Sequence, residues 1–378
     1  MLYTRTMRLV AQVKLLPRPD QAAVLRQTLK VANAACDYIS GEAWDRRVFG
    51  QFALHRLTYH QVRERFALSA QVTVRCIAKV CDAYKLDRRA RRTFRPTGSI
   101  AYDSRILRWK VAASEVSIWT VAGRQTIPFV CGERQRALLA TQQGESDLAL
   151  VKGKWYLFAT CNVEEPEPRD VSGVLGCDLG IVNILTDSDG TVYSGKAVEE
   201  SRRTFAHHRR NLQRKSTHPA RRKLKKIRGK QARYQKDMNH RISKAVVQNA
   251  EDTHRAIAIE ELGGIRDRVT VRRRQRAQLA NWSFAQLRGY LSYKAKRAGI
   301  ALVAVDPRNT SRQCPVCGHI EKANRSSQSV FLCRSCGHAG LADHIAAQNI
   351  AFRARAAVNL PMVPTYALAY ASGTSSRL

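Results

Sequence analysis

The stretch NTSRQCPVCGHIEKANRSSQSVFLCRSCGHAGLADHIAAQNIA spans residues 309–351 and decides the fold of the C-terminal part of the chain. It contains two Cys-x-x-Cys pairs, Cys314 with Cys317 and Cys333 with Cys336, separated by 15 residues. Zinc prefers four tetrahedral ligands, and thiolate sulfur is a favoured donor. The spacing is typical of a four-cysteine zinc ribbon. We therefore predict one structural Zn²⁺ bound by these four cysteines.

Two glycines support this interpretation. Gly318 and Gly337 each follow the second cysteine of a pair, where a tight turn often needs a positive φ. Two disulfides are the alternative, but a chain this basic does not resemble a secreted disulfide scaffold. His319 and His338 could serve as ligands, although four cysteines already complete the shell. Six further cysteines are scattered and are expected to be buried free thiols: Cys36, Cys76, Cys81, Cys131, Cys161 and Cys177.

The composition points to a polyanionic partner. The chain has 378 residues, 44% of them hydrophobic, a formal net charge of +35 and a pI of about 10.5. A soluble protein this basic usually works on nucleic acid. No apolar run is long enough to span a bilayer, and the N-terminus lacks the pattern of a signal peptide. We expect a cytoplasmic, nucleoid-associated protein with no membrane partner.

The N-terminal part alternates between two kinds of pattern. Residues 1–19 contain a strand, and residues 96–165 contain short β runs punctuated by glycines. Between them, residues 20–95 show helical periodicity, with Asp20 as the expected cap. We predict a β-barrel or sheet with a helical lobe inserted after its first strand. Four aromatic side chains could stack on bases, although core packing is favoured for most of them: Tyr84, Phe94, Trp109 and Trp119.

The C-terminal part follows an acidic linker, EEPEPRD, at residues 164–170. Short apolar strands are predicted before Asp178 and Glu260, and a helix and a strand lead into the ribbon. Residues 201–241 hold sixteen Lys and Arg but one acid, and residues 268–276 are also basic. Phosphate is the natural counter-charge for such stretches. The predicted domains are 171–308 with 341–356, the ribbon at 309–340, and a flexible tail at 357–378.

Three acids lie at the ends of predicted secondary-structure elements. Asp178 and Glu260 each end a predicted strand, and Asp343 opens a helix seven residues after Cys336. Clustered carboxylates raise one another's pKa values, and divalent metal relieves that repulsion. Two Mg²⁺ ions about 3.5–4 Å apart would serve phosphodiester hydrolysis. Gly180 was expected to permit close approach of backbone or nucleic acid to Asp178. As the alternative, each acid could be an ordinary turn or cap residue.

The choice between Glu260 and Glu261 is weakly determined by pattern. Alternation places Ile257, Ile259 and Glu261 on one face of the strand and Glu260 on the other. Nothing in the residues alone selects the face that carries the chemistry.

Several motifs together resemble the TnpB family of transposon-encoded RNA-guided DNA nucleases, which are related to miniature type V CRISPR effectors. They are GCDLGIVN at 176–183, AIAIEELGGIR at 256–266, the two cysteine pairs, and ADHIAAQNI at 342–350. NWSFAQLRGYLSYKAKRAGI at 281–300 is similar to the helix that precedes the ribbon in that family. The order of acid, acid, four cysteines and acid makes the resemblance specific.

The resemblance implies an α+β multidomain fold. An N-terminal wedge-like β-barrel with an inserted helical recognition lobe would precede an RNase H-like (RuvC-like) nuclease domain, and the zinc ribbon would interrupt that domain before the third acid. It implies Mg²⁺-dependent cleavage of double-stranded target DNA beside a short flanking motif, directed by guide RNA. Asp178, Glu260 and Asp343 would be the catalytic, metal-binding acids. The resemblance favours Glu260 over Glu261.

One position departs from the family pattern. The third motif commonly reads D-x-N-A-A-x-N, whereas this chain has Ile345 at the first Asn and retains Asn349. Three alternatives remain: an RNA-guided repressor that does not cut, a metal-dependent transposase or resolvase acting without RNA, and a non-catalytic zinc-ribbon module. The oligomeric state, the guide sequence and the flanking motif stay open.

Overall fold

The computed structural model describes residues 5–261 and 284–358. The chain divides into two compact units, Met1–Glu164 and Glu165–Leu378. The basic cluster predicted at residues 268–276 lies outside the described residues, as do Trp282 and all but two residues of the predicted tail. No helix in the described part of the chain combines the length and apolar character needed to cross a bilayer.

The first unit contains an antiparallel sheet in the order β2-β6-β7-β1-β5-β4-β3. Its strands are β1 (Thr6–Leu15), β2 (Ile100–Tyr102), β3 (Leu107–Lys110), β4 (Glu115–Thr120), β5 (Gly123–Val130), β6 (Gln142–Val151) and β7 (Lys154–Glu164). The order ends at β2 and β3, but the indole Nε1 of Trp109 on β3 donates to Ser146 Oγ on β6 at 3.3 Å. The predicted barrel is therefore a nearly closed sheet.

Three helices are inserted after the first strand, as the sequence predicts. They are α1 (Pro19–Asp45), α2 (Gln51–Phe66) and α3 (Ala70–Leu86), and a short α4 (Glu133–Leu139) follows β5. The expectation that Asp20 caps α1 is wrong. Arg18 is the N-cap and Pro19 the first helical residue, so Asp20 lies in the first turn, where its carboxylate accepts from the Arg18 guanidinium. Proline suits that first position because its missing N–H would be unpaired there anyway.

The four aromatic side chains considered for base stacking belong to the core of the first unit, as favoured from the sequence. Tyr84 is fully buried between the helices. Phe94, Trp109 and Trp119 pack against the same apolar cluster. The scattered cysteines are free thiols, buried except for the half-buried Cys131.

The second unit is built on a five-stranded sheet in the order β10-β9-β8-β11-β12. The strands are β8 (Gly173–Asp178), β9 (Asn183–Asp187), β10 (Val192–Ser194), β11 (Arg255–Glu260) and β12 (Leu302–Val305). β8, β11 and β12 run parallel, whereas β9 and β10 are antiparallel. Strands β8 and β11 are buried on both faces and read as continuous apolar runs, as parallel central strands do.

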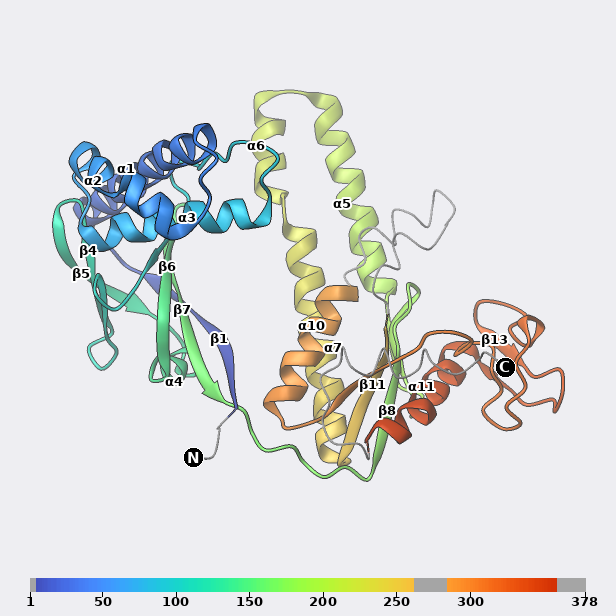
Figure 1. The fold of residues 1–378 in the computed structure, drawn as a ribbon. Coiled ribbons are helices and arrows are strands. Elements are labelled where there is room, and N and C mark those ends of the chain that lie inside the picture. Colours follow the sequence, from blue (N-terminus) through green and yellow to red (C-terminus); the bar gives the residue numbers. More distant parts are fainter. Residues whose placement is uncertain (1–4, 262–283, 359–378) are drawn as a thin grey trace. The chain divides into compact units, whose positions relative to one another are not determined.

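Helices cover both faces of this sheet (Figure 1). α7 (Lys230–Asp252) and α10 (Phe284–Arg297) pack on the face formed by Leu175, Cys177 and Ile257. α11 (Ala342–Val358) packs on the opposite face, against Val174 and Ala256 among others. Alternation along each strand therefore gives one face to the α7–α10 pair and the other to α11.

Gly176 lets α11 lie directly on β8. A Cβ built at Gly176 would lie 2.0 Å from the carbonyl oxygen of Ala347 and 2.6 Å from the amide nitrogen of Ala351. Both are backbone atoms of α11, so no side chain can rotate away to make room. The helix and the strand can approach this closely only because position 176 has no side chain.

Gly176→Ala is therefore expected to destabilise the second unit by about 3 kcal/mol or more, which is at the upper end for overpacking. Urea unfolding of the full-length protein measures this change. Gly173→Ala on the same strand is the matched control, because its Cβ would meet only the flexible Arg255 side chain at 3.6 Å or beyond. Equal stability of the two variants would show that α11 does not depend on the close approach.

A basic helical hairpin extends from the second unit. α5 (Lys196–Lys215) is followed by α6 (His218–Ile227), which leads into α7 (Figure 1). α5 has no buried residue and α6 only Ala220. Within the described residues, no ion pair involves the lysines and arginines between residues 209 and 236. This hairpin therefore presents positive charge to solvent that the described residues do not neutralise.

Candidate active site and metal centre

Three elements bring the predicted acids together at one edge of the five-stranded sheet. Asp178 ends β8 and Glu260 ends the adjacent parallel strand β11, where Ile259 pairs with Cys177. The carboxyl ends of parallel strands meet at the same edge. Asp343 lies in the first turn of α11, the helix that packs on β8. Residues 165 positions apart in the sequence therefore meet because α11 covers the strand that carries Asp178.

The acids lie close enough to affect one another's ionisation. Burial, together with the neighbouring carboxylates of Glu260 and Asp343, raises the pKa of Asp178 to about 8. Burial also raises the pKa of Glu260 above its ordinary value. Acids that resist ionisation in this way are poised for a compensating cation.

Glu260 and Glu261 have different surroundings. Glu260 lies on the face of β11 that α11 covers and carries the raised pKa. The Glu261 carboxylate forms a two-pronged ion pair with the Arg288 guanidinium of α10. The structure thus places the Glu260 carboxylate beside Asp178, whereas the Glu261 carboxylate pairs with Arg288.

Sequence reasoning missed three side chains that contact the acids. Asn183 Nδ2 donates to Asp343 Oδ2 at 2.9 Å, and Arg325 Nη2 lies 3.5 Å from Asp343 Oδ1. Arg325 also opposes the rise in the pKa values of both Asp178 and Glu260. Thr310 Oγ1 lies 2.5 Å from Glu260 Oε1. Asn183 stands in the first quoted motif, but nothing local distinguishes Arg325 among 65 basic residues.

Gly180 admits a close approach of backbone, as expected. Its Cβ would lie 2.8 Å from the carbonyl oxygen of Asn183, within the turn between β8 and β9. The glycine is therefore required by this turn, which lies next to Asp178. Its consequence for the site is indirect, because the same turn presents Asn183 to Asp343.

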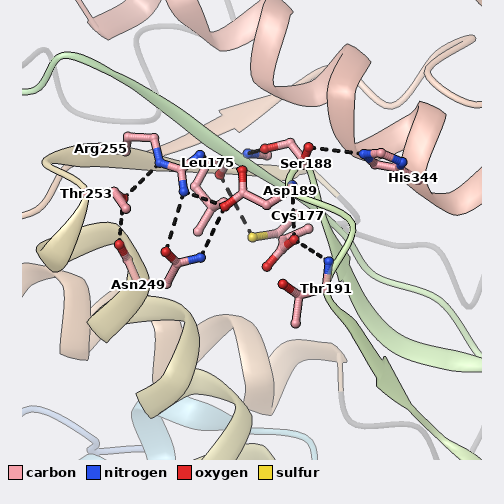
Figure 2. A network of polar contacts seen from close by, with 11 residues as sticks. Leu175, Cys177, Ser188, Asp189, Thr191, Asn249, Thr253, Arg255 and His344 are labelled. Atoms are coloured by element: carbon pink, nitrogen blue, oxygen red, sulfur yellow. Dashed lines mark hydrogen bonds and ion pairs between the residues drawn. The ribbon is translucent and has the colours of Figure 1, made fainter.

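The turn between β9 and β10 ties the start of α11 to the sheet. Figure 2 shows His344 approaching Ser188, and its Nε2 donates to the Ser188 carbonyl oxygen at 3.1 Å. Ser188 in turn accepts from the Gly176 amide through its hydroxyl. Asp189 is fixed by a two-pronged ion pair with Arg255 at 2.5 and 2.7 Å (Figure 2). The residue next to Asp343 is thereby anchored to the strand that carries Asp178.

The four predicted cysteines form a separate cluster. Their sulfur atoms all lie within 4.8 Å of one another, and the Cys314–Cys336 and Cys317–Cys333 sulfurs are 3.6 Å apart. A disulfide requires about 2.05 Å, whereas ligands of one tetrahedral Zn²⁺ at 2.3 Å are about 3.8 Å apart. The geometry fits one tetrahedral ion.

Each cysteine pair is closed by the same turn. The Gly318 amide donates to the Cys314 carbonyl and the Gly337 amide to the Cys333 carbonyl. Both glycines have a φ of 74°, which confirms the expectation of positive φ. His319 contacts Glu321 at 3.2 Å and takes no part in the cluster.

The acids are spaced more widely than the sulfurs. In the described part of the chain, the cysteines form the one group of three or more potential ligands whose ligand atoms all lie within 4.8 Å of one another. The three carboxylates therefore do not outline a cage for a single ion. This wider arrangement is compatible with two ions that share ligands.

Two family models match parts of this chain. The family OrfB_IS605, described as "Probable transposase", matches residues 158–263, and the Cas12f1-like TNB domain matches residues 284–350. The two matches contain all three acids and all four cysteines. The chain is a relative of the TnpB and Cas12f1 proteins.

The similarity extends to individual curated relatives. The chain is 33% identical over 219 residues to the CRISPR-associated endodeoxyribonuclease Cas12f1 of Sulfoacidibacillus thermotolerans, covering 53% of this chain and 50% of that protein. It is 29% identical over 218 residues to the putative RNA-guided DNA endonuclease InsQ of Escherichia coli K12, covering 52% and 53%. A TnpB-like protein of Methanocaldococcus jannaschii is 30% identical over 184 residues, covering 45% and 64%. The chain thus spans about half the length of the first of these curated relatives.

The fold is also similar to a solved structure. Cas12f1 in a complex with sgRNA and target DNA matches 89% of this chain and 83% of that protein, with a TM-score of 0.59 and 17% identity. At this identity the match concerns the fold alone. It extends over both units, whereas the two family matches begin at residue 158.

Ile345, the one departure from the TnpB motif, has a packing role in this structure. Its side chain joins the apolar cluster of the ribbon, with Cys314, Phe331, Cys333 and Ala342. Its Cδ1 would lie 3.3 Å from a Cβ at Gly340. At this position the chain therefore uses apolar packing to fasten α11 to the cysteine cluster.

Proposed function

We propose that this protein is an RNA-guided DNA endonuclease that cleaves double-stranded target DNA beside a short flanking motif. The observation that carries the proposal is the convergence of Asp178, Glu260 and Asp343 at one sheet edge, with the pKa of Asp178 raised to about 8. The names of the Cas12f1 and InsQ relatives support this choice among metal-dependent chemistries. All three acids are present, which favours cleavage over repression without cutting.

The acids fit two Mg²⁺ ions as ligands. Carboxylate oxygens are preferred donors for Mg²⁺, and these carboxylates are half-buried and mutually repulsive. When bound, two Mg²⁺ ions activate a water and stabilise the leaving oxygen of a phosphodiester. Asn183 orients Asp343 through its 2.9 Å hydrogen bond. Arg325 supplies positive charge beside the acids and is placed to attract the scissile phosphate.

The architecture proposed for this activity follows the two units. Residues 171–308 and 341–356 would form an RNase H-like (RuvC-like) nuclease domain, interrupted by a structural Zn²⁺ ribbon at 309–340. Residues 1–19 and 96–165 would form the wedge-like domain, and residues 20–95 the recognition lobe. The ribbon contributes Arg325 and Thr310 to the acid cluster, so it serves as more than a surface appendage.

The basic hairpin is the proposed contact for guide RNA and its DNA hybrid. Most Lys and Arg side chains of α5 and α6 are exposed. Phosphate contacts of this kind are not sequence-specific and release counterions. Sequence would instead be read by pairing with the guide, as in other RNA-guided effectors. Such a protein would work on the nucleoid, in the cytoplasm.

Purification of the full-length protein with sequencing of co-bound nucleic acid tests the proposal. We expect one discrete RNA species and cleavage of DNA matched to its guide segment when Mg²⁺ is added, but not in EDTA. Unmatched DNA of the same composition is the control. Cleavage without any bound RNA would indicate a transposase or resolvase. Guided binding without cleavage would indicate a repressor. Absence of both guided binding and cleavage would indicate a non-catalytic zinc-ribbon module.

A further inference from the structure

Thr310 makes the shortest contact with the acid cluster. It lies four residues before Cys314, is 3% exposed, and places Oγ1 2.5 Å from Glu260 Oε1 and 3.0 Å from the Pro307 carbonyl oxygen. A hydroxyl has one proton to donate. The shorter contact has the length of a charge-assisted O–H···O⁻ bond, so the Thr310 hydroxyl donates this hydrogen bond and Glu260 Oε1 accepts it. The bond engages one oxygen of Glu260 and leaves the other for a metal ion.

Asn349 holds Thr310 in place from α11. Its amide nitrogen donates to the carbonyl oxygens of Thr310 and Gln313, both at 2.7 Å, and the side chain is 3% exposed. Both amide protons are thereby used. Arg353, one turn further along α11, donates to the carbonyls of Asp306 and Arg308. The segment before the first zinc ligand is thus fastened to α11 on both sides of Thr310.

We infer that Thr310 is a positioning residue for Glu260, and that Asn349 sets the position of its hydroxyl. The inference rests on the proposed function, since it gives Glu260 the role of a metal ligand. Partners that orient a ligating carboxylate typically contribute 10–100-fold to metal affinity or activity. Through this contact, the ribbon and α11 both determine how Glu260 meets a metal ion.

The decisive comparison is Thr310→Val against Thr310→Ser. Valine keeps the shape and removes the hydroxyl, whereas serine keeps the hydroxyl. Titration of the zinc-loaded full-length protein with Mn²⁺, monitored by EPR, measures metal affinity without requiring cleavage. We expect Thr310→Val to weaken Mn²⁺ binding about 10–100-fold and Thr310→Ser to remain near wild type. Thr58→Val is the matched control, because Thr58 is a fully buried threonine in α2 whose hydroxyl donates to the Leu54 carbonyl.

A double-mutant cycle tests the link to Asn349. Asn349→Leu removes the two donors at similar volume and should weaken Mn²⁺ binding. Because both residues act through one hydroxyl, combining it with Thr310→Val should add little to the larger single effect. Fully additive effects would overturn the role given to Asn349.

The outcomes separate this inference from the proposed function. Wild-type Mn²⁺ affinity in Thr310→Val, with a large loss in Glu260→Gln, would overturn the inference and leave Glu260 as a metal ligand. Wild-type affinity in Glu260→Gln would instead contradict the proposed metal site. Equal losses in Thr310→Val and Thr58→Val, with equal falls in melting temperature, would reduce Thr310 to a packing residue and overturn the inference.

Discussion

Asp178→Asn is expected to lower guided DNA cleavage at least ~10³-fold, since changes in residues that merely support a metal ligand already cost 10–100-fold. Binding of guide RNA and of target DNA should stay within a few fold of wild type, because the exposed basic hairpin lies outside the acid cluster. Cleavage of matched DNA and filter binding of the same DNA measure the two effects. Asp252→Asn, at the C-terminal end of α7, is the matched surface control. Cleavage at the wild-type rate by Asp178→Asn would show that Asp178 is not an active-site residue.

The same substitution, Asp178→Asn, should stabilise the protein against unfolding at alkaline pH when no Mg²⁺ is bound. Burial and neighbouring acids raise the pKa of Asp178 to about 8 from an ordinary value of 3.8. The proton is therefore held more tightly in the folded state than in the unfolded state. The resulting stabilisation is complete below pH 3.8 and is lost as the pH rises through 8. Asn carries no charge at any of these pH values and does not incur this loss.

Melting temperatures of the zinc-loaded protein without added Mg²⁺, measured from pH 5 to pH 9, check this reasoning. Asp178→Asn should melt a few degrees above wild type at pH 9 and close to it at pH 5. Mg²⁺ should raise the melting temperature of wild type more than that of the variant, because it binds the ionised carboxylate. A difference between the two proteins that does not change with pH would contradict the raised pKa.

Cys333→Ser should lower cleavage more than ~100-fold while guide RNA binding changes little. Cys333 is one of four predicted zinc ligands, and loss of a ligand unfolds small zinc domains. The ribbon carries Thr310 and Arg325, which contact Glu260 and Asp343, and its apolar cluster includes Ile345 of α11. Without the metal, both contacts to the acids lose their support.

Zinc content by mass spectrometry, RNA binding and cleavage are measured on the same preparation. Cys81→Ser is the matched control, because Cys81 is a buried free thiol of the first unit and does not belong to the four-cysteine cluster. An equal loss of RNA binding and cleavage in Cys333→Ser would indicate unfolding of the whole protein and would contradict a role confined to the ribbon.

Much of the site could be predicted because its signals are local. The cluster of four cysteines could be predicted from the spacing of Cys314, Cys317, Cys333 and Cys336, since each pair closes a single turn. Strands β8 and β11 end at Asp178 and Glu260, as the sequence predicts, because buried parallel strands are short apolar runs. A helical lobe after the first strand was predicted from a change of period, and the structure shows that it consists of α1, α2 and α3. These inferences needed no knowledge of long-range contacts.

Other features had no local signature. Arg325 lies in the loop between the cysteine pairs and could not be told from other basic residues until the fold brought it to Asp343. Gly180 was expected to admit backbone or nucleic acid beside Asp178, and only the fold shows that the backbone of Asn183 lies closest. The cap of α1 was misplaced by two residues because Pro19 begins the helix ahead of Asp20.

By itself, the sequence determined the chemistry available to this protein: four thiolates at zinc spacing, three acids in order, and a large excess of positive charge. Only the tertiary structure decided how these groups act together. Gly176 admits α11 onto β8, and this packing carries Asp343 to Asp178 and Asn349 to Thr310. The raised pKa of Asp178 and the different surroundings of Glu260 and Glu261 both follow from burial and proximity, which depend on contacts between residues far apart in the chain.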